Sequence, residues 1–334
     1  YKINEAHTLT AGCKYEREHI FTSDMYYQLQ NLSGWGIDNQ HKLGQLPSET
    51  DMLQVIDTSN SKEIKETANT YKAEVNYHFE KNSYDLSVTF PLKVQKRSLS
   101  FFQNEMEKYA SKTLVATDLN LTFGTWMRGQ TGYNYHISYT LEHKLPQMIY
   151  LIDQTNDANP LYVVKGNADL RSSVQHNLNG NVYWAPSMRH NHSLSLGYSH
   201  INGLTALSAR FDRNSGVYTY TPQSVDGNQS FNVTLQDAVF LSPRYTHKLT
   251  NKLGAYLMKN VDFSGVSMEE YQKESTVRNY RLTEEITYNF STNNTKIRGG
   301  FSPYIYYNRS VSNREHFQDI NSFDFGAHFS MQFE

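Results

Sequence analysis

A chain of 334 residues suits one large all-β domain or two ordinary domains, and its composition favours the first. The 25 tyrosines and 17 phenylalanines fit half-buried strands, and a net charge of -2 gives no electrostatic basis for binding nucleic acid. The single cysteine, Cys13, excludes an internal disulfide and a cysteine-rich metal site.

Apolar and polar residues alternate along the whole chain, which predicts about twelve long antiparallel strands. We place these strands near residues 7–16, 70–80, 84–94, 113–123, 132–142, 175–184, 192–211, 217–241, 251–262, 276–291, 295–311 and 319–333. Leu86, Val88 and Phe90, for example, alternate with polar neighbours, so one face of the strand is apolar. Several of these strands exceed the roughly 9–11 residues that a tilted strand needs to cross a bilayer.

The segment between the first two predicted strands, residues 17–69, does not alternate and predicts a long surface loop. Pro47, followed by Ser48 and an acidic first turn, predicts a short helix within it. Tyr26, Tyr27 and Trp35 of the same loop are candidates for stacking against a ligand such as a sugar, although exposed loop aromatics are the simpler interpretation.

The lengths of the links between strands alternate as well. Even-numbered links are short, namely 81–83, 124–131, 185–191, 242–250 and 292–294. Odd-numbered links are mostly longer, namely 17–69, 95–112, 143–174, 263–275 and 312–318, with 212–216 as the exception. Outer-membrane barrels have short periplasmic turns and longer extracellular loops, so this parity favours a transmembrane β-barrel over a soluble sandwich.

Histidines are the first candidates for chemistry. His190 and His192 are two residues apart, so an extended backbone points both to one side, where they could share a metal ion. His176 and His200 would need the fold to bring them together. Because no carboxylate lies at a recognisable ligand spacing, we favour ordinary polar residues at a turn and at strand ends, and we expect no metal site and no cofactor.

Glu284 falls on the apolar side of its strand, between Leu282 and Ile286. Either Glu284 lies near a membrane interface, where the cost is small, or the alternation slips through a β-bulge; we favour the bulge. Tyr304, Tyr306, Tyr307 and Trp126 are interpreted as interfacial aromatic girdles.

No catalytic residues are predicted. No G-x-S-x-G elbow and no clear Ser/His/Asp arrangement is present, and Gly299-Gly300 lacks the surroundings of a phosphate loop. We therefore expect no enzymatic activity, and a barrel protease or lipase is the weakest of the hypotheses.

The segment from Gln154 onward carries a family resemblance. Asp157-Ala158-Asn159-Pro160-Leu161-Tyr162 leads into Lys165-Gly166-Asn167-Ala168-Asp169-Leu170, and Gln175-His176-Asn177 opens the next strand. This resembles the phrase "NPLY…GNPDLKPE…H-N" of TonB-dependent receptors and related outer-membrane barrels of Bacteroidetes type. Ala168 departs from the usual proline, Arg171-Ser172-Ser173 replaces "KPE", and the chain ends on Glu334 rather than on an aromatic residue.

The resemblance covers about the last two-thirds of the chain and implies an outer-membrane receptor that binds a small nutrient ligand at its extracellular loops. Such receptors take energy from a TonB-type system through an N-terminal plug, and no plug is found here. We therefore expect residues 1–334 to form a single barrel domain within the outer-membrane lipid, as part of a larger barrel. A signal peptide is expected to be removed or to lie outside the sequence. Asn159, Asn167 and Asp169 join the three loop aromatics as candidate ligand-binding residues.

Two other classes of protein stay open. A plugless porin-like or structural outer-membrane barrel would keep the strands but would not gate uptake. A soluble all-β carbohydrate-binding protein would need no detergent and would leave the parity of the link lengths unexplained.

Overall fold

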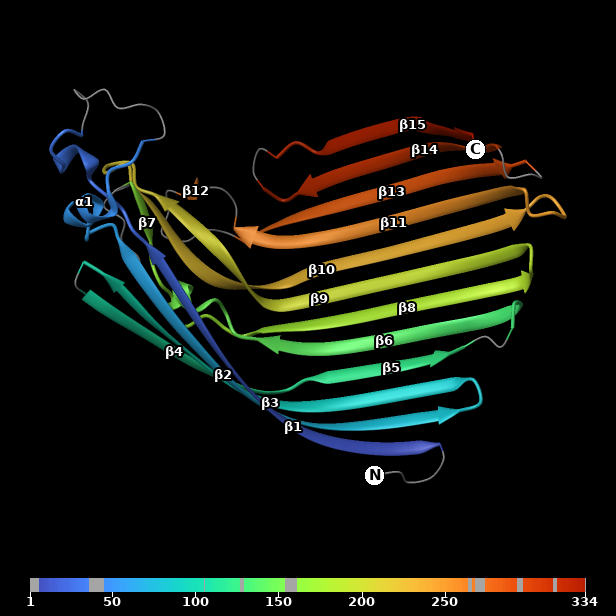
Figure 1. Cartoon of the computed structure of the whole chain (residues 1–334), viewed down its shortest axis with the longest axis horizontal. Helices are drawn as coiled ribbons and strands as arrows, with labels where there is room; N and C mark the ends of the chain where they lie inside the picture. Colours follow the sequence, from blue (N-terminus) through green and yellow to red (C-terminus); the bar gives the residue numbers. More distant parts are fainter. Residues whose placement is uncertain are drawn as a thin grey trace.

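The protein is all-β, and a single sheet organises it (Figure 1). The computed structural model describes residues 6–35, 45–104, 106–126, 129–153, 161–263, 266–267, 274–292, 297–314 and 317–333. The strands are β1 (His7–Asp24), β2 (Lys62–Lys81), β3 (Tyr84–Gln103), β4 (Met106–Thr117), β5 (Leu119–Thr125), β6 (Gly132–Lys144), β7 (Tyr162–Val164), β8 (Ser173–Ser187), β9 (His190–Phe211), β10 (Tyr218–Phe240), β11 (His247–Phe263), β12 (Val266–Ser267), β13 (Glu274–Ser291), β14 (Ile297–Ser312) and β15 (Ile320–Phe333).

Twelve of these strands follow one another across the sheet in the order β1-β2-β3-β5-β6-β8-β9-β10-β11-β13-β14-β15. Each of these neighbours is antiparallel, so successive connections lie at alternate ends of the sheet. About twelve strands were expected from the alternation, and the path has twelve. The predicted loop 17–69 is too long, because β1 continues to Asp24 and β2 already begins at Lys62. The short strands β7 and β12 pair in parallel with β10 and β9.

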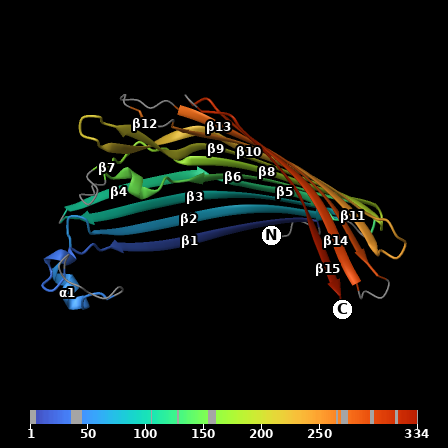
Figure 2. The ribbon, with the colours of Figure 1, turned by 90° about the horizontal axis from the view of Figure 1, so that it is seen from above.

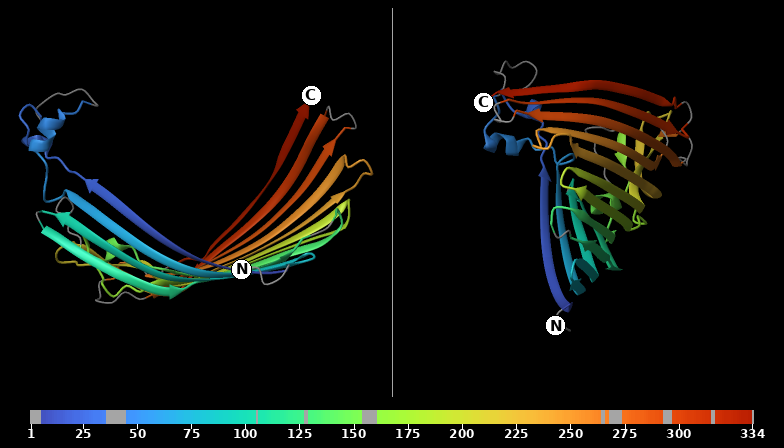
Figure 3. Two further views of the ribbon diagram at one scale, coloured as in Figure 1. Left: turned by 60° about the horizontal axis from the view of Figure 1, so that its bottom comes forward. Right: turned by 90° about the vertical axis from the view of Figure 1, so that its right-hand side faces the viewer.

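The sheet is bowed along its strands and bent across them into an open trough (Figures 2 and 3). Its two edges are β1 and β15, which pair only with β2 and β14 within the described chain. The sheet therefore does not close on itself, and the predicted barrel is not formed by the described residues.

The connections largely follow the predicted parity. At one end, here called the turn end, β2 and β3 are joined at 82–83, with Asn82 at a φ of 59°, and β8 and β9 are joined at 188–189. At the other end, the loop end, residues 25–61 and 145–172 make long connections. The prediction of a long link at 95–112 is wrong, because β3 and β4 continue as a hairpin to Asn104.

The expected strand at 113–123 is interrupted. β4 and β5 both pair with β3, and they are separated at Asp118, whose backbone N–H donates to the carbonyl oxygen of Pro91 at 3.0 Å. The register is the same on both sides of this position, because the pairs Leu92–Thr117 and Thr89–Asn120 belong to one continuous alignment. β4 projects beyond β6 at the loop end, since it is β5 that pairs with β6.

The first long loop contains the predicted helix. α1 (Glu49–Gln54) begins after Ser48, whose hydroxyl accepts a hydrogen bond from the backbone N–H of Asp51. This is the N-cap interaction that satisfies one of the free amide groups at a helix start. A 3-10 turn, η1 (Leu29–Asn31), lies in the same loop, and η2 (Met148–Leu151) lies in the second long connection. Neither α1 nor any other helix among the described residues has the length and apolar character to cross a membrane.

Candidate functional site

Register sorts the side chains of the twelve path strands into two faces. One face, here called the apolar face, carries rows such as Leu194–Leu235–Leu253, each residue directly opposite the next on adjacent strands. Large side chains on it are strongly exposed: Leu235 is 46% exposed, and Phe325 on β15 is 72% exposed. A soluble monomer rarely exposes a continuous apolar surface of more than a few hundred Å². The apolar face is therefore an exposed hydrophobic surface that runs across the sheet from β1 to β15.

Glu284 lies within the apolar face. Its register partners are Leu253 on β11 and Ile305 on β14, and the pairing of β13 continues on both sides without a shift. The predicted bulge is therefore wrong, and the alternation keeps its phase through this carboxylate.

The expected tyrosine girdle is also corrected in part. Tyr304 and Tyr306 lie opposite Glu285 and Thr283, on the polar face, and only Tyr307 shares the apolar face with Leu282. The ring of Tyr304 covers Gly326 on β15, where a Cβ would lie 2.6 Å from the tyrosine oxygen. Whether a tyrosine lies on the apolar or the polar face depends on its position in the alternation of the strand. The number of tyrosines does not reveal it.

At the loop end, residues 145–153 and 161–172 fold back over the polar face; we call them the covering segment. Met148 and Ile152 pack against Leu99, Phe101 and Ala110 in a buried apolar cluster. β7 extends the cover by pairing with β10, and the backbone N–H of Lys165 donates to Tyr220 at 2.8 Å. The described residues of the second long connection therefore form a layer on the sheet.

The Gly166–Asp169 part of the covering segment is held by its own polar groups. A Cβ on Gly166 would lie 2.5 Å from the backbone carbon of Ile152, so only glycine allows this approach. The Asn167 side chain donates to the carbonyl oxygen of Pro222 at 2.9 Å and accepts from the backbone N–H of Asp169 at 2.9 Å. These contacts give the G-N-x-D phrase a structural role.

A reciprocal bulge anchors the end of the covering segment. Between β9 and β10, the backbone N–H of Gly203 donates to Asp226, and the backbone N–H of Gly227 donates to Asn202. Both glycines have positive φ, of 72° and 84°. Arg171 then forms an ion pair of 2.8 Å with Asp226. The covering segment is thus bonded to β10 at the place where the pairing register of β9 and β10 shifts twice.

Replacing Gly166 with alanine is expected to displace the covering segment, because backbone atoms of Ile152 and Asp153 surround the new methyl group. Overpacking of this kind costs about 1–3 kcal/mol. Limited proteolysis should then cleave the covering segment faster. Gly180→Ala is the matched control, since its nearest neighbour is a side-chain atom 3.9 Å away. Equal protease resistance of both variants would contradict this role of Gly166.

A polar groove lies on the polar face beside the covering segment. Its volume is about 590 Å³, and it is lined by Glu16, Arg17, Glu18, Ala68, Thr70, Lys72, Lys93, Gln95, Arg97, Glu142, His143, Lys144 and Leu145. These residues come from β1, β2, β3 and β6 and from the start of the covering segment. The lining carries both positive and negative side chains. The groove therefore offers hydrogen-bond donors and acceptors, and it does not have a single sign of charge.

Lys93 lines this groove and connects β3 to Asp118 and to His143 on β6. Its ammonium group donates to Asp118 at 2.8 Å and to the carbonyl oxygen of His143 at 2.7 Å, and its side chain is only 9% exposed. Asp118 in turn accepts from the backbone N–H of His143 at 2.9 Å. Arg97 forms an ion pair with Glu66 nearby on β2. A buried charge needs such partners, so Asp118 and Glu66 hold the cations of Lys93 and Arg97 in place in the lining of the groove.

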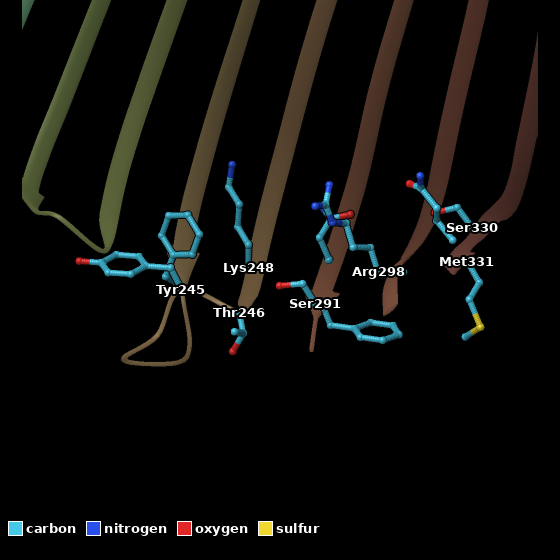
Figure 4. Close-up of a pocket in the computed structure, with 12 residues that line it drawn as sticks. Tyr245, Thr246, Lys248, Ser291, Arg298, Ser330 and Met331 are labelled. Carbon is cyan, nitrogen blue, oxygen red and sulfur yellow. The ribbon is translucent and has the colours of Figure 1, made fainter. Parts of the chain in front are cut away.

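A second hollow, of about 420 Å³, lies at the turn end between the β10–β11 connection and β15 (Figure 4). Lys248 and Arg298 contribute cations to it from β11 and β14, with Ser330 and Gln332 opposite. The Lys248 ammonium lies 5.7 Å from the centre of the Phe240 ring. This hollow is basic, whereas the groove at the loop end is mixed in charge.

Five of the sequence-predicted site residues are described, and they lie at the loop end in two different segments. Tyr26 is 46% exposed, and Tyr27 bridges to Ile56 across the first loop. Trp35 lies half-buried farther along this loop. Hydrogen bonds from the side chains of Asn60 and Gln28 hold the pKa of the Asp57 carboxyl below its ordinary value, and the backbone N–H of Asp57 donates to Tyr26.

The other three predicted residues belong to the second long connection. Asn167 is half-buried and engaged in holding the covering segment, and Asp169 beside it is exposed. Asn159 lies outside the described residues. Sequence reasoning did not find the groove residues Lys93 and His143 or their partner Asp118, because the three come from separate segments of the chain and share no motif.

No protein-family model matches this chain, and no curated protein matches it either. The functional argument therefore depends on the faces of the sheet, the groove and the covering segment.

Proposed function

We propose that this chain is the membrane-spanning sheet of an outer-membrane β-barrel that binds a polar nutrient ligand at its loop end and admits it to the cell. The observation that carries the proposal is the continuous exposed apolar face, matched by a polar face on the other side of the same strands. A lipid-embedded barrel requires this division on every strand. It also places short turns at one end and longer loops at the other.

Closure is part of the proposal. A path of twelve antiparallel strands leaves β1 and β15 running in opposite directions, so they or additional strands between them can complete a barrel without a parallel pair. Exposed edges of this length would otherwise pair with other chains. The resemblance to TonB-dependent receptors supports a larger barrel with energy supplied through a plug.

The ligand side of the proposal depends on the loop end. The polar groove beside Lys93 combines cations, carboxylates and amide groups, which suits a neutral or zwitterionic ligand rich in hydrogen-bonding groups. The covering segment lies next to it and is tied to β10 through β7, Asn167 and Arg171, and its displacement would widen the passage. We therefore propose non-covalent capture and passage.

The test is the behaviour of the full-length protein in membranes. We expect it to stay in the outer-membrane fraction after washing with alkaline carbonate, and to migrate differently in detergent gels before and after boiling. Quantitative release into the aqueous fraction without detergent would refute the membrane assignment. A soluble carbohydrate-binding protein gives that second result, so one experiment separates the two classes.

A further inference from the structure

Two histidines and one aspartate converge at the turn end, outside the groove and the covering segment. His190 and His192 open β9, and Asp237 lies near the end of β10. The register places Asp237 directly opposite His192 and places Val239 opposite His190, so all three polar groups lie at the turn end of the apolar face, two residues beyond Leu194 and Leu235. Figure 1 shows this end of β9 and β10 on the right.

Their ligating atoms are already close to one another. His190 Nε2 lies 2.9 Å from Asp237 Oδ1, and His192 Nδ1 lies 3.0 Å from the same oxygen. All three ligating atoms lie within 4.8 Å of one another. Ligands at about 2.0–2.2 Å from a tetrahedral zinc ion lie only slightly farther apart than these hydrogen-bonding distances. Small rotations of the side chains would therefore open the site for an ion.

The surroundings orient the ligands and leave them accessible. The indole ring of Trp184 stacks on His192, with ring centres 4.9 Å apart, which fixes the orientation of that imidazole. The side chains of His190, His192 and Asp237 are 39%, 29% and 47% exposed, so an ion can enter from outside. Asn251 on β11 occupies the register position opposite Asp237, on the side away from His192.

We propose that His190, His192 and Asp237 form a binding site for a divalent transition-metal ion of the zinc class. Two imidazoles and one carboxylate are a common protein ligand set for such ions, and they leave a position for water or another ligand. A bound ion would link β9 to β10 at the turn end. This proposal is independent of transport, because the site lies at the other end of the strands from the groove.

The experiment is a titration of the purified full-length protein in detergent, first stripped with a chelator, with zinc chloride in a calorimeter. We expect one saturable equivalent per chain that His192→Ala and Asp237→Asn each weaken by about tenfold or more. His247→Ala is the matched control, because His247 lies at the same end and hydrogen-bonds Tyr288 rather than a carboxylate. It should bind zinc as the parent does.

A second readout separates ligation from altered folding. Cupric ion bound to the parent should show nitrogen coupling in electron paramagnetic resonance, and this coupling should decrease in His190→Ala while the boiling-dependent gel shift is unchanged. Zinc binding that is equally strong in the His190→Ala/His192→Ala double variant would overturn the proposal, as would equal loss in His247→Ala. In that case, the three residues form ion pairs only.

Discussion

Replacing Leu235 with arginine is expected to prevent stable insertion of the protein into lipid bilayers, whereas the same replacement of its neighbour Thr234 is not. Leu235 lies within the apolar face, between Leu194 and Leu253, and its side chain is 46% exposed. An arginine facing lipid costs up to about 2–4 kcal/mol, the value at the bilayer midplane. A cost of 2–4 kcal/mol reduces the equilibrium ratio of inserted to uninserted protein by about one to three orders of magnitude.

The matched control for Leu235→Arg is Thr234→Arg. Thr234 occupies the next position on β10, on the polar face, opposite Ser195 and Gly254, so a long side chain there meets small neighbours. Both variants add the same charge to the same strand, and only the face differs. The measurement is the fraction of protein that becomes resistant to protease in vesicles. Equal insertion of the two variants would mean that the apolar face does not contact lipid.

Truncating Phe101 to alanine is expected to release the covering segment from the sheet. Phe101 is 1% exposed and packs with Leu99, Ala110, Met148 and Ile152. Removing a buried phenylalanine ring costs about 3–5 kcal/mol, because both the transfer energy and the packing around the cavity are lost. That cost is comparable to the whole stability of a marginal local unit, so residues 145–153 should open while the sheet persists.

Hydrogen exchange measures this opening directly. In the parent, the amide of Tyr150 donates to Gln147 and that of Ile152 donates to Ile149, so both are expected to exchange slowly. In Phe101→Ala both should exchange faster, while amides in the middle of β3 stay protected. Phe102→Ala is the control, since its ring is on the other face and lies under the ammonium of Lys65. Unchanged exchange of the covering segment in Phe101→Ala would show that other contacts hold it.

The sequence by itself determined the all-β class, the number of strands in the path and the division of each strand into two faces. These are local properties, because side chains alternate along any extended backbone wherever the strand later pairs. The helix start at Ser48 was equally local, since its cap needs only the next three residues. The alternation also places Glu284 on the apolar face, where the structure has it.

Tertiary structure alone decided which polar residues meet. His190 and Asp237 are 47 positions apart, and only the register of β9 and β10 places them together. The same holds for Lys93, Asp118 and His143, which come from three segments of chain. Link lengths left this register open, as the unexpected extension of β3 and β4 demonstrates. Pairing depends on hydrogen bonds between distant strands, and a pattern that repeats every two residues does not specify which distant position lies opposite.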